Sequence, residues 1–183
     1  MKINLTQNKN FKLFKIISKV AQENNQTVYI VGGYVRDLLM QRKAPTDIDF
    51  VTEQSGIELA KAVGKELGDL KVSVFKTYGT AMIKYQDLDL EFVGARKESY
   101  SEDSRKPAVE TGTLEDDQKR RDFTVNALAI SLNSENFGEL IDPFNGRGDM
   151  LNKILRTPLE PVQTYSDDPL RMMRAIRFAS VLH

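Results

Sequence analysis

The chain has 183 residues, in which 26 Lys and Arg balance 26 Asp and Glu, and 40% of the residues are hydrophobic. This length suits one globular domain, or one domain and the start of another. The absence of Cys excludes a disulfide scaffold and Cys-ligated metals, and the single histidine, His183, excludes a Ser-His-Asp triad. No apolar run approaches the roughly 20 residues that span a bilayer. With no signal-peptide core at the N-terminus, we expect a cytoplasmic protein without membrane contact.

The spacing of apolar residues predicts a mixed α/β arrangement over the first half of the chain. The expected elements are helices over residues 10–24, from 35 onward and over 55–67, and strands over residues 28–31, 48–52, 72–76, 80–85 and 88–93. This order favours one layered system of sheet and helices.

Residues 95–118 are highly charged and show no clear period, which is typical of a functional loop. We then expect a short strand over residues 137–141, a turn over 142–146 and a helix over 167–183. We accordingly divide the chain into a head domain, residues 1–142, and a helical second domain, residues 143–183. The helical pattern is still running at the last residue, so we expect that second domain to be cut off.

A Gly-Gly turn links a predicted strand to a predicted helix at Gly32 and Gly33. Glycines let backbone N–H groups approach an anion there, and Arg36 in the following helical turn could clamp phosphate oxygens. These residues are therefore candidate triphosphate ligands. The alternative is a tight turn followed by a surface arginine.

Two carboxylates lie two residues apart on a predicted strand, at Asp47 and Asp49. Strand geometry directs both to one face, where they repel each other unless a cation lies between them. Mg²⁺ favours such a pair together with phosphate oxygens, so the pattern predicts a two-metal site for phosphoryl transfer. Asp87, Asp89 and Glu91 alternate on a later strand, and Glu91 is a possible third metal carboxylate. A solvated strand face is equally consistent with them.

The sequence RRDFTVNALA at residues 120–129 adds a further motif. Together with GGYVRD at residues 32–37, DID at 47–49 and DDPLR at 167–171, it resembles the class II tRNA nucleotidyltransferase/poly(A) polymerase family. The resemblance covers about residues 26–180. It implies a polymerase-beta-like nucleotidyltransferase head with a mixed, largely antiparallel sheet flanked by helices, followed by the first helices of an all-α neck.

The same resemblance assigns roles to individual residues. It implies that Asp47 and Asp49 are catalytic and hold Mg²⁺, and that Gly32, Gly33 and Arg36 meet the triphosphate. Arg121 and Asp122 match the segment that recognises the ribose, where a carboxylate accepting from the 2′-hydroxyl would favour ribonucleotides. Asn126, in the same motif, is a further possible substrate contact. A charge cluster on a helix surface is the alternative for the arginine pair and Asp122.

The base-reading motif of the family, usually Glu-Asp-x-x-Arg, reads Asp167-Asp168-Pro169-Leu170-Arg171 here. Asp168 can accept from the amino group of cytosine or adenine while Arg171 donates to the ring nitrogen. Uracil and guanine present the reversed pattern. The alternative is helix capping, with Ser166 as the N-cap. Asp167 and Arg174 are further possible substrate contacts, whereas Arg177 could equally be a surface ion-pair partner.

We therefore expect an enzyme that adds CMP and AMP from CTP and ATP to the 3′ end of tRNA or another RNA. The alternatives are a poly(A) polymerase, an enzyme adding only A or only CC, a small-molecule adenylyltransferase, and a non-catalytic nucleotide- or RNA-binding module. Basic residues of the 95–118 loop could touch RNA phosphates. The sequence leaves the oligomeric state open.

Overall fold

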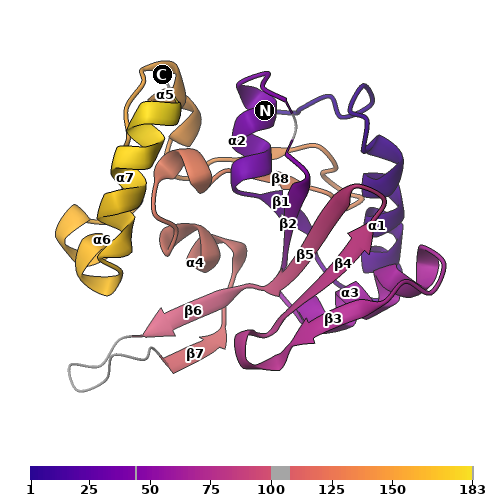
Figure 1. The fold of residues 1–183 in the computed structure, drawn as a ribbon. Helices are drawn as coiled ribbons and strands as arrows, with labels where there is room; N and C mark the ends of the chain where they lie inside the picture. The colour runs from indigo at the N-terminus through magenta and orange to yellow at the C-terminus, as the bar shows by residue number, and fades with distance from the viewer. Residues whose placement is uncertain (44, 100–107, 183) are drawn as a thin grey trace.

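A seven-stranded mixed sheet forms the centre of the computed structural model, which describes residues 1–43, 45–99 and 108–182 (Figure 1). Its strand order is β3-β4-β5-β2-β1-β8-β9. The strands are β1 (Tyr29–Val31), β2 (Asp47–Thr52), β3 (Val72–Phe75), β4 (Thr80–Tyr85), β5 (Leu88–Gly94), β8 (Ala129–Ser131) and β9 (Leu140–Ile141). Neighbouring strands are antiparallel except for β2 and β5, which run parallel. The expected mixed, largely antiparallel sheet is confirmed.

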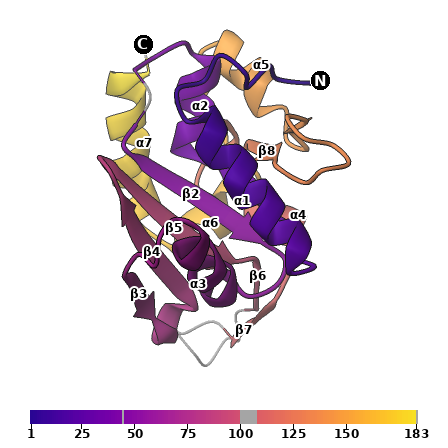
Figure 2. The ribbon, with the colours of Figure 1, turned by 90° about the vertical axis from the view of Figure 1, so that its right-hand side faces the viewer.

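Helices α1 (Phe11–Glu23) and α3 (Gly56–Glu66) cover one face of this sheet (Figure 2). Their apolar sides pack on the sheet in one core, in which Phe14 of α1 meets Phe50 of β2, and Phe50 stacks on Phe92 of β5. The helix bounds agree with the expected ranges to within one residue. With this face closed by helices, the polar residues of β2 and β5 belong to the opposite face.

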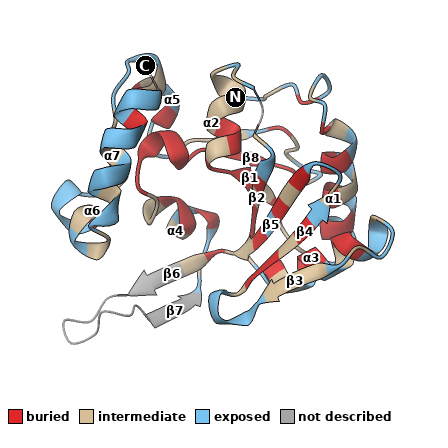
Figure 3. Ribbon diagram, in the orientation of Figure 1, coloured by how far each residue is buried: buried red, intermediate tan, exposed pale blue. Residues whose placement is uncertain are grey.

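The remaining helices lie toward the C-terminus, apart from α2 after the Gly-Gly turn. They are α2 (Gly33–Leu39), α4 (Leu114–Lys119), α5 (Gly146–Leu151), α6 (Pro161–Asp167) and α7 (Leu170–Val181), with short 3-10 turns η1 (Lys76–Tyr78) and η2 (Thr124–Asn126). Phe178 of α7 packs edge-on against Phe123, with ring centroids 5.8 Å apart. This contact holds α7 to the rest of the chain, whereas Leu170, Met173 and Ile176 on the same helix stay exposed (Figure 3).

The prediction of a loop over residues 95–118 is wrong at both ends of the segment, where the structure has strands and a helix. Strands β6 (Arg96–Ser99) and β7 (Ala108–Thr111) pair in a separate hairpin, and α4 follows them. Helix α4 begins with a capping box, in which the Thr113 side chain and the Asp116 carboxylate each accept from the other's backbone N–H. That cap needs no apolar period, which is why periodicity alone missed the helix. Residues 100–107 of the predicted loop lie outside the described residues, as does His183.

The helix expected over residues 167–183 is interrupted at its start. Asp168 is extended, with φ −146° and ψ 95°, and separates α6 from α7. A residue before proline avoids the helical region, and Pro169 follows Asp168. The strand expected over residues 137–141 is also shorter: Gly138 has φ 83°, Glu139 forms an isolated bridge with Lys2, and only Leu140–Ile141 forms a strand of the sheet.

The model contains no helix, within the described ranges, that is both long and apolar enough to cross a membrane.

Candidate active site

The two predicted carboxylates lie on β2, on the sheet face away from α1 and α3. Ile48 and Phe50 are fully buried in the core, so the alternation of the strand places Asp47 and Asp49 on the other side. Asp47 is exposed and Asp49 half-buried. The expected pairing of these two side chains on one face is confirmed.

Glu91 joins them from the neighbouring strand. In the parallel register of β2 and β5, Asp49 lies opposite Glu91, and Asp47 lies opposite Asp89. Asp89 forms an ion pair with Lys84 at 3.5 Å, and Asp87 precedes the strand. Of the three acids on this segment, Glu91 is therefore the one placed beside Asp49.

The carboxyl groups of Asp49 and Glu91 both have a pKa above the ordinary value. Burial raises the pKa of Asp49; Arg121 opposes this rise and Asp47 adds to it. Partial burial and the charge of Asp49 likewise raise the pKa of Glu91. Within the described residues, no group of three or more acidic, His or Cys side chains is placed to hold a metal ion. The donor set instead suits Mg²⁺, which takes one or two carboxylates and completes its shell with phosphate oxygens and water.

The Gly-Gly turn lies directly against these acids. Gly32 has φ 73°, and a Cβ added there would lie 2.8 Å from Nη1 of Arg121 and 3.5 Å from Oδ2 of Asp49. The backbone of Gly32 thus faces the Arg121 guanidinium and the Asp49 carboxylate at close range. Only glycine combines this backbone conformation with this approach.

Arg36 lies in a closed network in this structure. Its guanidinium donates to both carboxylate oxygens of Asp37, at 2.9 Å each, and to Oδ1 of Asn126 at 2.7 Å. It also lies over the ring of Phe178, 5.3 Å from the centroid. Arg36 therefore connects α2 to η2 and to α7.

The arginine pair Arg120–Arg121 is organised by Asp117, which the sequence analysis did not identify. The Asp117 side chain is fully buried and accepts from the guanidinium groups of both arginines. Burial alone would raise the pKa of Asp117, but Arg121 and Arg120 overcome it and hold the pKa below its ordinary value. The signal was present in the sequence, because residues three and four apart share a helix face.

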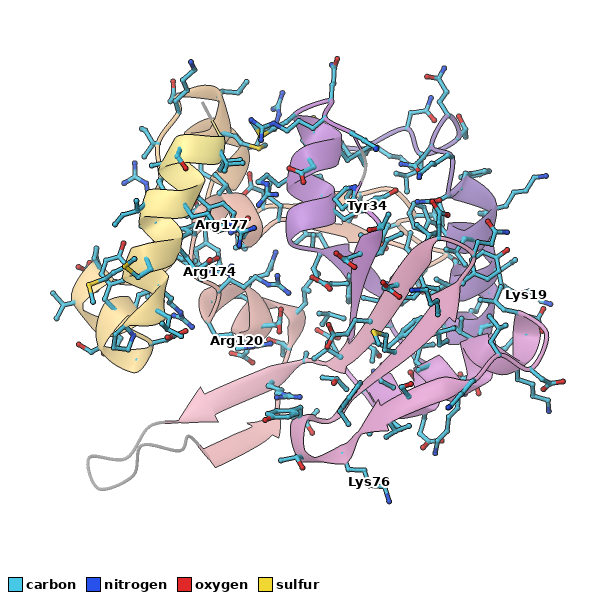
Figure 4. The ribbon with its side chains drawn as sticks, viewed as in Figure 1. Lys19, Tyr34, Lys76, Arg120, Arg174 and Arg177 are labelled. Atoms are coloured by element: carbon cyan, nitrogen blue, oxygen red, sulfur yellow. The ribbon has the colours of Figure 1, made fainter. Side chains whose placement is uncertain are left out.

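Asp122 lies between the arginine pair and α7. One carboxylate oxygen accepts from the backbone N–H of Phe123 and from Nδ2 of Asn126, and the other accepts from Nε of Arg174 at 2.7 Å. Arg174, which the sequence analysis considered a possible substrate contact, is thus an ion-pair partner of Asp122. The guanidinium of Arg177 lies over the Phe178 ring, 6.0 Å from the centroid (Figure 4).

The expected base-reading residues occupy the junction of α6 and α7. Asp168 accepts from the backbone N–H of Leu170 at 3.0 Å and lies 3.8 Å from Nε of Arg171. Arg171 donates to the backbone carbonyl of Arg120 at 2.7 Å. The alternative of an N-cap at Ser166 is wrong, because Ser166 lies within α6, and it is Asp168 that accepts from the first backbone N–H of α7. Asp167 accepts from Gln163 and takes no part in these contacts.

These contacts join most of the predicted residues into one continuous network. It runs from Asp49 and Gly32 through Arg121 to Asp117 and Arg120, and from there to Arg171. A second branch connects Arg36, through Asn126 and Asp122, to Arg174. Carboxylates for a cation, a glycine turn and polar groups from α7 are thereby assembled around one face of the sheet.

Comparison with known proteins gives a consistent result. The chain is 46% identical over 155 residues to an A-adding tRNA nucleotidyltransferase of Aquifex aeolicus, covering 85% of this chain and 18% of that protein. It is 36% identical over 175 residues to an A-adding tRNA nucleotidyltransferase of Halalkalibacterium halodurans, covering 94% of this chain and 40% of that protein. The chain thus spans less than half the length of these two relatives.

Solved structures match it as well. One, a tRNA-processing enzyme in an apo form, has a TM-score of 0.84 and 40% identity, covering 98% of this chain and 44% of that one. Another, a tRNA nucleotidyltransferase with a primer tRNA and an incoming ATP analogue, has a TM-score of 0.78 and 43% identity, covering 89% of this chain and 44% of that one. The expected polymerase-beta-like head is confirmed. The model of the poly A polymerase head domain matches residues 28–156, and the chain belongs to this family of nucleotidyltransferases.

Proposed function

We propose that this chain is the nucleotide-transferring part of an enzyme that adds CMP and AMP, from CTP and ATP, to the 3′ ends of tRNA without a template. The observation that carries the proposal is the alignment of Asp49 with Glu91 across β2 and β5, directly beside Gly32 and Arg121. The two acids can hold a metal ion, and the glycine turn lets a triphosphate approach that ion. This arrangement suits the transfer of a nucleotidyl group. The names of the relatives from Aquifex aeolicus and Halalkalibacterium halodurans agree with nucleotide addition to tRNA.

In the proposed reaction the RNA 3′-hydroxyl oxygen attacks the α-phosphorus of the nucleotide. A new bond forms between this oxygen and phosphorus, the bond to the bridging oxygen of the β-phosphate breaks, and pyrophosphate leaves. Asp47 and Asp49, with Glu91 as a third carboxylate, would hold Mg²⁺, which would supply charge neutralisation at the phosphates and a lowered pKa for the 3′-hydroxyl.

Residues around the cation would position the nucleotide. Gly32 and Gly33 leave room for a phosphate next to Asp49, and Arg121 supplies positive charge there. Arg36 would meet the triphosphate only by giving up part of its contact with Asp37 or Asn126. The negative charge of a bound triphosphate would compensate Arg36 for the contact that it loses.

The sugar and base would lie toward α7. Each carboxylate oxygen has two lone pairs, so Asp122 retains acceptor capacity for a ribose 2′-hydroxyl beside its contacts with Asn126 and Arg174. Asp168 would offer its half-buried carboxylate to the amino group of cytosine or adenine. Arg171, held by the Arg120 carbonyl, would donate to the ring nitrogen with its remaining N–H groups.

An enzyme that adds only the terminal A is the second candidate. Both relatives compared above carry that name, at 46% and 36% identity, while a CCA-adding enzyme of Geobacillus sp. is 37% identical over 168 residues. We place the border between the head and the helical second domain at residues 142 and 143, directly after β9. A cytoplasmic location stays a prediction.

The test uses two tRNA transcripts, one that lacks the whole 3′-terminal CCA sequence and one that lacks only its final A. Extension of each is measured with CTP, ATP or both, in Mg²⁺. Addition of C, C and A to the shorter transcript supports CCA addition. Extension of only the longer transcript, by A, favours the A-adding enzyme. Runs of A on any RNA would identify a poly(A) polymerase, and no product with any RNA would contradict the proposal.

A further inference from the structure

A cavity with no role in the proposed function adjoins Asp49 and Glu91, on the side away from the glycine turn. It has a volume of about 530 Å³ and is lined by residues of β3, η1, β4, β5, β6 and the end of α4, including Phe75, Tyr78, Glu91, Arg96 and Arg120. Figure 4 shows Arg120 at the end of α4, above the hairpin strand β6. The volume is that of a small-molecule site rather than of a packing defect.

The sheet order places this cavity opposite the proposed nucleotide site. Strand β2, with Asp47 and Asp49, lies between β1, which leads into Gly32, and β5, which carries Glu91. Glu91 belongs both to the cavity lining and to the position paired with Asp49. Transfer between two substrates needs one on each side of the catalytic carboxylates, and the cavity supplies the second side.

Two aromatic rings stand exposed at the cavity. Tyr78 is 65% exposed and Phe75 46% exposed. The η1 turn that presents Tyr78 ends at Gly79, which has φ 59°. A Cβ added at Gly79 would lie 3.5 Å from Nη2 of Arg96, so the Arg96 guanidinium lies against this turn. Exposed aromatic rings beside arginines are the elements with which proteins stack and hold single-stranded nucleic acid.

The charged residues of the cavity lining indicate how a bound nucleotide would be oriented. Arg96 and Glu91 both belong to the cavity lining, so the wall carries a positive and a negative group. A phosphate beside Glu91 would be repelled, whereas a sugar hydroxyl there would be accepted. Phosphates therefore belong beside Arg96 and Arg120, and the sugar edge beside Glu91.

We infer that this cavity holds the 3′-terminal nucleoside of the acceptor RNA, with its base stacked on Tyr78 and its ribose directed toward Glu91 and Asp49. The inference rests on the proposed function and extends it by naming the seat of the second substrate. Stacking accepts any base, since every base has a π-face. A site of this kind suits an enzyme whose acceptor end changes with each added nucleotide.

The direct experiment is photo-crosslinking of the full-length protein to a tRNA transcript that carries 5-iodocytidine at its 3′ end. Near-ultraviolet light joins this base to an aromatic ring stacked on it, and mass spectrometry locates the bond. The expected crosslink lies on Tyr78 or Phe75. A crosslink confined to α7 or to residues outside the cavity overturns the inference. This readout does not require turnover, so it separates failure of the seat from failure of the proposed function.

Three variants test the same site by kinetics. Tyr78→Leu keeps the apolar bulk but removes the ring, Tyr78→Phe keeps the ring, and Phe137→Leu makes the same ring removal beside Phe11, outside the cavity. We expect Tyr78→Leu to raise KM for the acceptor tRNA about 5- to 20-fold, the lower part of the range for loss of one base stack. KM for CTP and ATP should not change, and Tyr78→Phe and Phe137→Leu should resemble the parent protein.

Two outcomes would overturn the inference. An unchanged acceptor KM in Tyr78→Leu, with transfer intact, would show that the ring does not hold the RNA end. A raised KM for CTP or ATP in place of the acceptor would show that the cavity holds the incoming nucleotide.

Discussion

The buried carboxylate of Asp117 accepts from Nε of Arg121 at 3.0 Å and holds this guanidinium against Gly32 and Asp49. The same carboxylate binds Arg120, which lines the aromatic cavity. One residue of a short helix thus holds both the guanidinium group beside Asp49 and the guanidinium group in the cavity lining. Asp117 is a positioning residue, since it contacts the arginines and not the proposed substrates.

Removing this carboxylate should affect both stability and transfer. Asp117→Ala leaves two guanidinium groups without their buried partner, and we expect a loss of about 3–5 kcal/mol in the free energy of unfolding. Asp117→Asn should retain more stability yet lower kcat, because Arg121 is no longer held beside Asp49. Chemical denaturation and steady-state kinetics measure the two effects.

Glu115→Ala, on the same helix, is the matched control. Glu115 pairs with Lys119 at 2.7 Å on the surface, and such a pair contributes at most about 1 kcal/mol. If Asp117→Asn matched this control in kcat, the positioning role would be refuted.

Gly32→Ala should separate backbone strain from blockage of the site. At φ 73° and ψ −136° the substitution costs about 1–3 kcal/mol in backbone strain, and the new Cβ would also lie 2.8 Å from Nη1 of Arg121. Gly68→Ala also strains the backbone, since Gly68 has φ 102°, but nothing lies within 4 Å of its added Cβ. We expect both variants to melt earlier and only Gly32→Ala to lose nucleotide binding. Equal loss of binding in both would contradict the assigned role of Gly32.

Asp49→Asn should stabilise the protein at neutral pH while removing transfer. The pKa of Asp49 is raised in the folded state from an ordinary value of 3.8, so the folded protein keeps a proton that the unfolded chain has lost. Stability therefore falls as pH rises through the interval between the two values, and this fall is absent in Asp49→Asn. The melting temperature of the variant should exceed that of the parent at pH 7. The difference between the two melting temperatures should become smaller as the pH is lowered toward 3.8.

The control for this measurement is Asp89→Asn, on the neighbouring strand. Asp89 pairs with Lys84 on the surface, so its removal should leave the melting temperature unchanged or slightly lower. An Asp49→Asn protein that melts below the parent at pH 7 would contradict the account of strain at Asp49.

Asp122→Asn should weaken the preference for ribonucleotides. Asparagine offers only one acceptor oxygen where the carboxylate now serves Asn126 and Arg174 with two. We expect the ratio of kcat/KM for CTP over dCTP to fall by about tenfold or more, since a site that hydrogen-bonds a hydroxyl discriminates strongly against its absence. The control is Arg177→Ala. Arg177 lies on α7 with Arg174, but its guanidinium lies over the Phe178 ring. An unchanged ratio in Asp122→Asn would place ribose recognition elsewhere.

The sequence predicts the sheet and its acids well because their physics is local. Alternation at Asp47–Phe50 and helical periodicity at Phe11–Glu23 depend only on neighbouring residues, and both are confirmed. Strand β6 and helix α4 were missed because most of their positions are charged, and β7 was missed because it is only four residues long and pairs with β6 alone. The α6–α7 break was visible only in the effect of Pro169 on Asp168.

The network around the site could not be read from the sequence for a different reason. Contacts such as Arg174 with Asp122 or Arg36 with Asn126 join residues 52 and 90 positions apart, and only the packing of α7 and η2 brings them together. Sequence motifs identify such residues as important without showing which of them bind each other. Their roles toward nucleotide stay predictions for the experiments above.

The most direct test of the account is nucleotide-induced thermal stabilisation in Mg²⁺, comparing CTP, ATP, GTP, UTP and dCTP at equal concentration. We predict that CTP and ATP raise the melting temperature, that GTP, UTP and dCTP raise it much less, and that Asp49→Asn abolishes the effect of Mg²⁺. Equal stabilisation by all five nucleotides, or the same shifts without Mg²⁺, would contradict the assignment of Asp168, Arg171, Asp122 and the carboxylate pair.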